Sequence, residues 1–292
     1  MTTLPQPTLS RRTLLAGALA TPALLTGATR FHPAQRTAAA PAPVPGDPRH
    51  WAYTGQNGPT HWGDIGYPTC STGSRQSPID LTGADRTRLR NPRLTLSEAT
   101  GHVHDTGHAL LFTPQDTGRQ RMTLGGRTYT FRQMHHHTPG EHQVDGRLYP
   151  AEAHLVFQHE ESKALAVVGV LLRGGGRTHR GWEDYVAAAR RVAPFGPEAV
   201  DEPVEVPTAG GQGDPGVPAR LRLATMLPAH RGSLRYTGSL TTPPCTEGVA
   251  WTVFDTPVVL SDRQIAALSA HHNGNNRPVQ PRLGRDLLHD LR

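Results

Sequence analysis

Alternating apolar and polar side chains in the middle of the chain predict β-strands. Residues 129–137 and 151–157 both alternate, and successive side chains on a strand point to opposite faces. Residues 165–172 form a continuous, valine-rich apolar run, which is typical of a strand buried on both faces. Weaker strand patterns occupy residues 91–96 and 110–113. The pattern therefore predicts a mostly β protein.

Few segments show the apolar spacing of a helix. Residues 182–192 show it, and residues 261–270 open with Ser261 followed three residues later by Gln264, which is a capping-box pattern. Residues 207–218 are dense in glycine and proline and predict a surface loop. We therefore expect a mostly β, α+β fold with short helices at its periphery.

Histidines gather on two of the predicted strands. One face of residues 129–137 would carry Tyr129, Phe131, Gln133, His135 and His137, and His136 would point to the other face. One face of residues 151–157 would carry Glu152, His154 and Val156. The sequence Val144-Asp145-Gly146-Arg147 between them carries an Asp-Gly hairpin signal. We expect the two histidine strands to be antiparallel neighbours.

Three of these histidines fit the needs of a catalytic zinc ion. Such a site takes three protein ligands and leaves a fourth position for water, and His135, His137 and His154 can supply them. Gln133 and Glu152 each precede a ligand by two residues and could orient its imidazole. A His-x-His pair alone is often only two polar side chains on one face of a strand. Gln133 and Glu152 could likewise be ordinary polar strand residues. A buried glutamate needs hydrogen bonds, however, which favours the metal site.

The excess of positive charge lies mainly at the N-terminus. The whole chain of 292 residues has a net charge of +6 from 30 basic and 24 acidic residues. Residues 1–45 hold four of the arginines and no acid, so the remainder has 26 bases against 24 acids, or +2. No basic stripe with interleaved aromatic residues occurs, which excludes a nucleic-acid partner.

The first 45 residues resemble an export signal followed by a linker. Ser10-Arg11-Arg12-Thr13-Leu14-Leu15 precedes an alanine-rich apolar run, the pattern of a twin-arginine signal. A short membrane anchor is the alternative, but the run falls below the roughly 18 apolar residues that a span requires. We expect residues 1–45 to form the signal and a Pro/Ala-rich linker, and residues 46–292 to form one catalytic domain. The mature protein would be periplasmic or extracellular.

The chain has two cysteines, Cys70 and Cys245. An even number of cysteines in an exported protein favours a disulfide bond, and two buried free thiols are the alternative. A bond across so long a loop would stabilise the fold by roughly 2 to 4 kcal/mol.

Several short motifs, in order along nearly the whole mature chain, resemble the alpha-class carbonic anhydrases. They include Trp51-Ala52-Tyr53, Gln56-Asn57-Gly58-Pro59, His61-Trp62, Arg75-Gln76-Ser77-Pro78-Ile79, Gly107-His108, residues 133–142, residues 149–156, residues 238–245 and residues 276–281. The resemblance implies a single domain with a large, mostly antiparallel twisted sheet of ten strands. It also implies zinc-dependent, reversible hydration of carbon dioxide to bicarbonate and a proton. Carbonic anhydrase is itself the standard example of zinc lowering the pKa of a bound water to about 7.

The resemblance also assigns roles to individual residues. Thr241 would accept a hydrogen bond from the attacking hydroxide and donate its own proton to Glu141, and His108 would be the proton shuttle. The substrate pocket would be formed by Thr242, Tyr53, Val156, Val167, Leu240, Val249 and Trp251. Met134 and His136 stand where the family commonly has phenylalanine. The resemblance therefore does not predict how the side chains behind the zinc strand pack.

Two other functions are possible alternatives. An inactive, zinc-free relative could serve as a binding or storage module, although all the expected ligand and catalytic residues are present. A zinc ester hydrolase is the second, but the chain has no nucleophile-elbow motif, so ester cleavage is expected only as a side activity. The only expected partner is a small-molecule substrate, with no stable membrane span, and the sequence leaves monomer and homodimer both open.

Overall fold

The computed structural model describes residues 50–90, 92–116, 118–193 and 216–290. The proposed export signal, its linker and most of the glycine- and proline-rich loop lie outside these residues. Among the described helices, none is long and apolar enough to cross a membrane.

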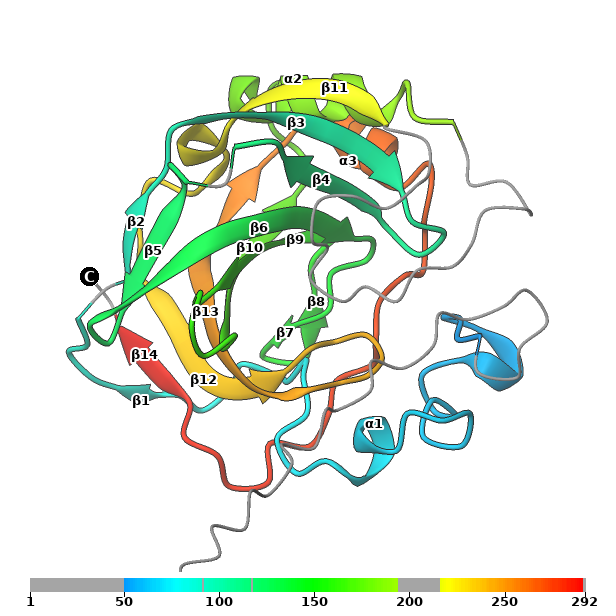
Figure 1. Ribbon diagram of the computed structural model, residues 1–292, viewed down its shortest axis with the longest axis vertical. Helices are drawn as coiled ribbons and strands as arrows, with labels where there is room; N and C mark the ends of the chain where they lie inside the picture. The colour runs from blue at the N-terminus through cyan, green and yellow to red at the C-terminus, as the bar shows by residue number, and fades with distance from the viewer. Residues whose placement is uncertain (1–49, 91, 117, 194–215, 291–292) are drawn as a thin grey trace, which may run out of the picture. The chain divides into compact units, whose positions relative to one another are not determined.

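One large twisted sheet dominates the described structure (Figure 1). Its strands in chain order are β1 (Asp85–Arg86), β2 (Arg93–Thr95), β3 (Glu98–Asp105), β4 (Leu110–Pro114), β5 (Arg121–Leu124), β6 (Arg127–His137), β9 (Ala151–Gln158), β10 (Leu165–Arg173), β11 (Val217–Arg222), β12 (Ser233–Ser239), β13 (Glu247–Val259) and β14 (Leu288–Asp290). Ten of them form a continuous path in the order β1-β14-β12-β13-β10-β9-β6-β4-β3-β11, and β5 joins β2 to β6. The sheet is mixed, because β1 pairs with β14, and β10 with β13, in parallel. The predicted mostly β fold is confirmed.

The remaining elements are short. The Asp-Gly turn closes a hairpin, with Asp145 and Gly146 at positive φ, but it joins the short strands β7 (Gln143–Val144) and β8 (Arg147–Leu148) in a two-stranded sheet of their own and does not join β6 directly to β9. The helices are α1 (Thr69–Thr72), α2 (Arg180–Ala189) and α3 (Asp262–Leu268), with 3-10 turns at Gly55–Asn57 and Leu223–Met226. Ser261 and Gln264 make the predicted capping box at the start of α3. Figure 1 shows α2 and α3 beside the β3–β11 end of the sheet.

The pairing of β6 with β9 brings the predicted metal ligands together. The two strands are antiparallel, and His135 lies directly opposite His154. The expectation that the two histidine strands are antiparallel neighbours is confirmed.

A β-bulge in β6 corrects one part of the face assignment. The register against β9 shifts between Phe131 and Gln133, so that Arg132 is the extra residue. A bulge reverses the alternation beyond it. Phe131 therefore packs in the same core cluster as Met134, on the face opposite His135, and not on the histidine face as predicted. Tyr129 packs in that cluster too.

The predicted loop at residues 207–218 is also shorter at its C-terminal end than expected. Val217 and Pro218 already belong to β11, which pairs with β3. Pro218 fits there because β11 ends the strand order, and an edge strand tolerates a residue without a backbone N–H. The part of this loop before residue 216 lies outside the described residues.

Two apolar clusters cover the two faces of the sheet around β6 and β9. The larger one contains Met134 and Leu155 and packs against α2 through Trp182 and Tyr185. The second contains Val156 and Trp251 on the face that carries the histidines. The candidate metal ligands thus project from a sheet whose other face is packed against a helix-covered core.

Candidate metal centre

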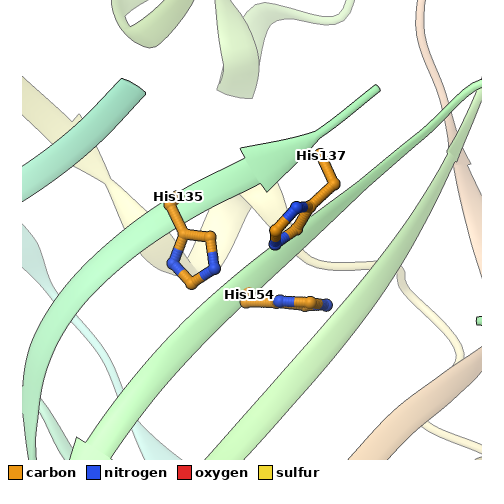
Figure 2. Close-up of side chains that lie close together, drawn as sticks. All are labelled: His135, His137 and His154. Atoms are coloured by element: carbon orange, nitrogen blue, oxygen red, sulfur yellow. The ribbon is translucent and has the colours of Figure 1, made fainter. Parts of the chain in front are cut away.

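Three buried imidazoles meet on one face of the sheet. His135 and His137 project from β6 and His154 from β9 (Figure 2). Each offers a ring nitrogen that lies within 4.8 Å of the others, and the ring centroids are 4.8 to 5.1 Å apart. The strand alternation and the cross-strand pair His135–His154 produce this arrangement.

Each of these imidazoles has its other nitrogen fixed by a hydrogen bond. Nδ1 of His135 lies 2.8 Å from Oε1 of Gln133, and Nε2 of His154 lies 2.9 Å from Oε1 of Glu152. Nδ1 of His137 lies 2.6 Å from the main-chain oxygen of Asn275. Since all three acceptors are oxygens, each bonded ring nitrogen carries the proton. Nε2 of His135, Nε2 of His137 and Nδ1 of His154 are then left with lone pairs that can bind a metal.

The charge state of the ligands also suits a metal ion. Burial lowers the pKa of His137 to about 4 and holds the pKa of His135 well below its ordinary value. Neutral imidazole is the form that coordinates metals. Nε2 of His137 and Oε2 of Glu141 are buried without a hydrogen-bond partner among the described residues. A zinc ion would satisfy the nitrogen, so the residues fit the ion.

Glu141 lies directly beside the three imidazoles. Its Oε2 is 3.5 Å from Nε2 of His137 and 3.9 Å from Nδ1 of His154, and its Oε1 accepts the main-chain N–H of Arg277. Burial raises the pKa of Glu141 to about 7, although neighbouring His154, the Arg277 N–H and a hydrogen bond with the Thr241 side chain oppose the rise. Glu141 and Thr241 thus form the expected pair next to the metal-facing nitrogens.

Glu152 connects the candidate metal ligand His154 to a second buried histidine. Its Oε1 lies 2.6 Å from Nδ1 of His142, and its Oε2 accepts the main-chain N–H groups of Glu141 and His142. Burial opposes ionisation of Glu152, but the adjacent His142 and His154 outweigh it and hold the pKa well below its usual value. The other ring nitrogen of His142 contacts the Tyr236 hydroxyl at 2.7 Å. Strand alternation predicts a site role for neither His142 nor Tyr236, because His142 lies beyond the end of β6 and Tyr236 is 94 residues away on β12.

The predicted apolar wall gathers beside the histidines. Val156, Val167, Val249 and Trp251 belong to one buried cluster, and Leu240 packs against it. The Trp251 ring lies 4.9 Å from the His154 ring, and Thr242 is buried in the loop that follows Leu240. The side chains expected to line a pocket for a small apolar molecule are therefore adjacent to the metal site.

His108 lies in an aromatic setting at the turn between β3 and β4. Its ring stacks on Trp51 with a centroid separation of 3.5 Å and an interplanar angle of 14°, and Tyr53 lies edge-on at 6.2 Å. Only 5% of His108 is exposed. Burial raises the pKa of Tyr53 well above its ordinary value, so its hydroxyl stays protonated at neutral pH.

The predicted disulfide bond joins Cys70 to Cys245. Cys245 ends the loop that carries Thr241, and its N–H donates to the main-chain oxygen of Thr242. Arg277, buried below Trp62, donates from Nη2 to the main-chain oxygen of Cys70. The disulfide and Arg277 therefore hold together the segments that carry Thr241 and Glu141. Arg277 belongs to the motif at residues 276–281. No sequence pattern predicts that it holds these two segments together.

The two departures from the family pattern, Met134 and His136, both point away from the metal ligands. Met134 fills part of the larger core. Nε2 of His136 lies 2.9 Å from the main-chain oxygen of Leu268, and its Nδ1 lies 2.8 Å from the Tyr185 hydroxyl. The partner required for a buried His136 is thus supplied by α2 and the end of α3.

The fold and this site define a class of protein. A set of three neutral imidazoles with one position left open is typical of catalytic metal sites, whereas structural zinc sites are closed by four protein ligands. The set lies on a large β-sheet, next to an apolar wall and a Thr–Glu pair. The chain therefore carries a buried histidine cluster that could bind a metal ion, in the setting expected of an enzyme.

Comparisons with known proteins identify the family. The protein-family model of the eukaryotic-type carbonic anhydrases matches residues 57–290 of the sequence. A carbonic anhydrase of Pectobacterium carotovorum is 32% identical over 248 residues, which cover 83% of this chain and 92% of that protein. An alpha-carbonic anhydrase structure from Photobacterium profundum has a TM-score of 0.69 at 32% identity and covers 82% of this chain and 100% of its own. The alpha-carbonic anhydrase of Thermovibrio ammonificans, solved with the inhibitor sulfanilamide, has a TM-score of 0.68 at 33% identity. The match covers 82% of this chain and 99% of that chain.

The chain therefore belongs to the eukaryotic-type, or alpha, carbonic anhydrase family. This confirms the family and the enzyme class that the sequence motifs indicated. Family membership implies reversible hydration of carbon dioxide.

Proposed function

We propose that this protein hydrates carbon dioxide reversibly with one zinc ion held by His135, His137 and His154. The observation that carries the proposal is the hydrogen bonding of the three imidazoles, which leaves one metal-facing nitrogen on each. A zinc ion bound there would lower the pKa of a water molecule enough to supply hydroxide at neutral pH, an effect for which carbonic anhydrase is the standard example.

Thr241 and Glu141 would orient the attacking hydroxide. Glu141 accepts the Arg277 N–H at Oε1, and the Thr241 hydroxyl would donate its proton to Glu141, an interaction that lowers the pKa of this carboxyl. With its proton directed at Glu141, the Thr241 oxygen can only accept a hydrogen bond from the hydroxide. A lone pair of the hydroxide then faces the substrate carbon, and such alignment lowers the barrier to attack.

The apolar wall would hold carbon dioxide beside this nucleophile. Val156, Val167 and Trp251 present no charge or unpaired donor to a small, uncharged substrate. Carbon dioxide loses little hydration on entering such a pocket, whereas the bicarbonate product is an anion and is better solvated outside. The site therefore favours release of the product.

His108 would return the proton from the site to solvent. An imidazole can accept and release a proton near neutral pH, and the Tyr53 ring lies edge-on beside the His108 ring.

Stopped-flow measurement of carbon dioxide hydration, together with zinc analysis, tests the proposed function. The purified protein is expected to hold one zinc ion per chain, and a chelator is expected to lower hydration by at least about 10³-fold. Added zinc should restore the rate. Stoichiometric zinc without hydration would contradict the proposal and favour a binding or storage module, and faster cleavage of esters than hydration of carbon dioxide would favour a hydrolase.

We further propose that Arg11 and Arg12 direct export of the folded protein. The dipeptide precedes an apolar run in a segment without acidic residues, and a twin-arginine pair is the feature that distinguishes this export route. Replacing both with lysine keeps the charge, and the unprocessed protein is expected to stay in the cytoplasm on cell fractionation. The variant Arg36→Lys is the charge-matched control. Export of the double variant at the normal level would refute the assignment.

A further inference from the structure

Residues 272–275 contact both parts of the molecule that the proposed reaction requires. One part is the end of β6, which carries the metal ligand His137. The other is the turn at residues 105–109, which carries the proposed shuttle His108. The segment follows α3 in sequence, more than 130 residues from either part.

Several hydrogen bonds attach this segment to the end of β6. The Thr138 N–H donates to Oδ1 of Asn275 at 2.9 Å, and the Thr138 hydroxyl donates to the main-chain oxygen of His272 at 2.8 Å. His137 donates from Nδ1 to the main-chain oxygen of Asn275 at 2.6 Å. The segment is therefore fixed relative to a metal ligand.

Two further contacts attach the same segment to the turn that carries His108. Nδ2 of Asn275 donates to the main-chain oxygen of His108 at 3.1 Å. His272 lies with Nε2 2.6 Å from Oδ1 of Asp105, and this oxygen also accepts the Gly107 N–H at 2.8 Å. Both ends of the turn are thus held by the segment that holds β6.

The side chain of Asn275 uses its full donor capacity in this bridge. Its Nδ2 faces two carbonyl oxygens, those of His108 and His136, and its Oδ1 faces an N–H. If the amide oxygen and nitrogen were exchanged, the oxygen would face the carbonyl oxygens of His108 and His136. The neighbouring groups therefore determine the orientation of the amide. The side chain is only 3% exposed, so water cannot readily replace these bonds. An amide is the required group, because a carboxylate has no donor.

We propose that the Asn275 side-chain amide positions the His108 turn relative to the metal-ligating strand and thereby supports proton transfer from the metal site to His108. The inference rests on the proposed function. Asn275 is a positioning residue, since it acts through the main chain of His108. Because Asn275 donates to the main-chain oxygen of His108, it fixes the turn without using a ring nitrogen of the His108 imidazole.

Hydrogen–deuterium exchange tests the positioning itself, independently of activity. The variant Asn275→Asp keeps the shape and the acceptor for Thr138 but removes both donors. Loss of one such bond is expected to speed exchange of the amides at residues 106–109 by about fivefold, with β10 unchanged. Asn275→Ser is a second variant in case the buried carboxylate prevents folding. Asn273→Ser, with an exposed side chain in the same segment, is the matched control and should change neither region.

Steady-state kinetics test the consequence for catalysis. Proton return follows product release, so it limits kcat and not kcat/KM. In weak buffer, kcat of the Asn275 variants is expected to fall about fivefold, with kcat/KM within about twofold of the parent enzyme. The reference variant His108→Ala should lose kcat on the order of tenfold. Added imidazole should restore kcat in both cases.

The outcomes separate this inference from the proposed function. Unchanged exchange at residues 106–109, or faster exchange throughout the chain, would overturn the positioning role, as would an equal fall in kcat and kcat/KM. A parent protein without hydration activity would refute the proposed function, and the exchange data would then decide alone whether Asn275 positions the turn.

Discussion

Replacement of His154 by alanine is expected to abolish zinc retention and, with it, hydration of carbon dioxide. Zinc sites with four ligands have apparent binding free energies of about 10 to 16 kcal/mol, or about 2.5 to 4 kcal/mol per ligand. Loss of one ligand should therefore weaken binding by roughly 10² to 10³-fold. Elemental analysis after dialysis against a chelator, and a stopped-flow assay without added zinc, measure both effects.

His154 is the decisive ligand to change because it alone comes from β9. His135 and His137 would remain on β6, but two imidazoles from one strand do not enclose an ion. The control is His61→Ala, which removes an exposed histidine and should leave zinc content and activity unchanged. A His154→Ala protein that is folded by circular dichroism and still holds one zinc per chain would refute the ligand assignment.

The site could be predicted where it depends on strand alternation. Alternation places His135 and His137 on one face, and the hairpin signal at residues 144–147 predicts that β6 and β9 are neighbours. The structure agrees with both, since His135 lies opposite His154. Gln133 and Glu152 follow from the same rule, because two residues along a strand return to the same face.

Contacts made by main-chain atoms could not be predicted in this way. The acceptor for His137 is the main-chain oxygen of Asn275, 138 residues away in the sequence. Every residue type has such an oxygen, so side-chain identity carries no signal for it. The same holds for the Arg277 N–H that binds Glu141.

The bulge at Arg132 marks a second limit of the sequence pattern. Alternation alone assigns Phe131 to the histidine face, whereas the extra residue moves it to the core on the other side. The shift places the Phe131 ring in the larger apolar cluster, where it is fully buried. A periodic pattern cannot reveal one inserted residue when both faces are largely buried, as they are along β6.

Replacement of Thr241 by valine is expected to lower kcat/KM for hydration on the order of 100-fold while zinc content stays at one per chain. Valine keeps the shape of threonine but lacks the hydroxyl, so the hydroxide nucleophile loses its acceptor and Glu141 loses a donor. Removal of one preorganised hydrogen-bonding group from a reaction centre costs about 2.7 to 4 kcal/mol, or roughly 10² to 10³-fold in rate. Stopped-flow hydration and elemental analysis of the same sample measure the two quantities.

The control for this change is the same substitution at a buried threonine that faces away from the metal. Thr252 lies on β13 within the sheet, and its hydroxyl has no hydrogen-bond partner among the described residues. Thr252→Val should leave hydration unchanged and should not destabilise the fold, because it removes an unpaired buried hydroxyl. If Thr241→Val hydrates carbon dioxide as fast as Thr252→Val, orientation of the nucleophile does not depend on Thr241. A loss of zinc from Thr241→Val would instead show that Thr241 supports the metal site, and the Thr241–Glu141 pair would then need a different role.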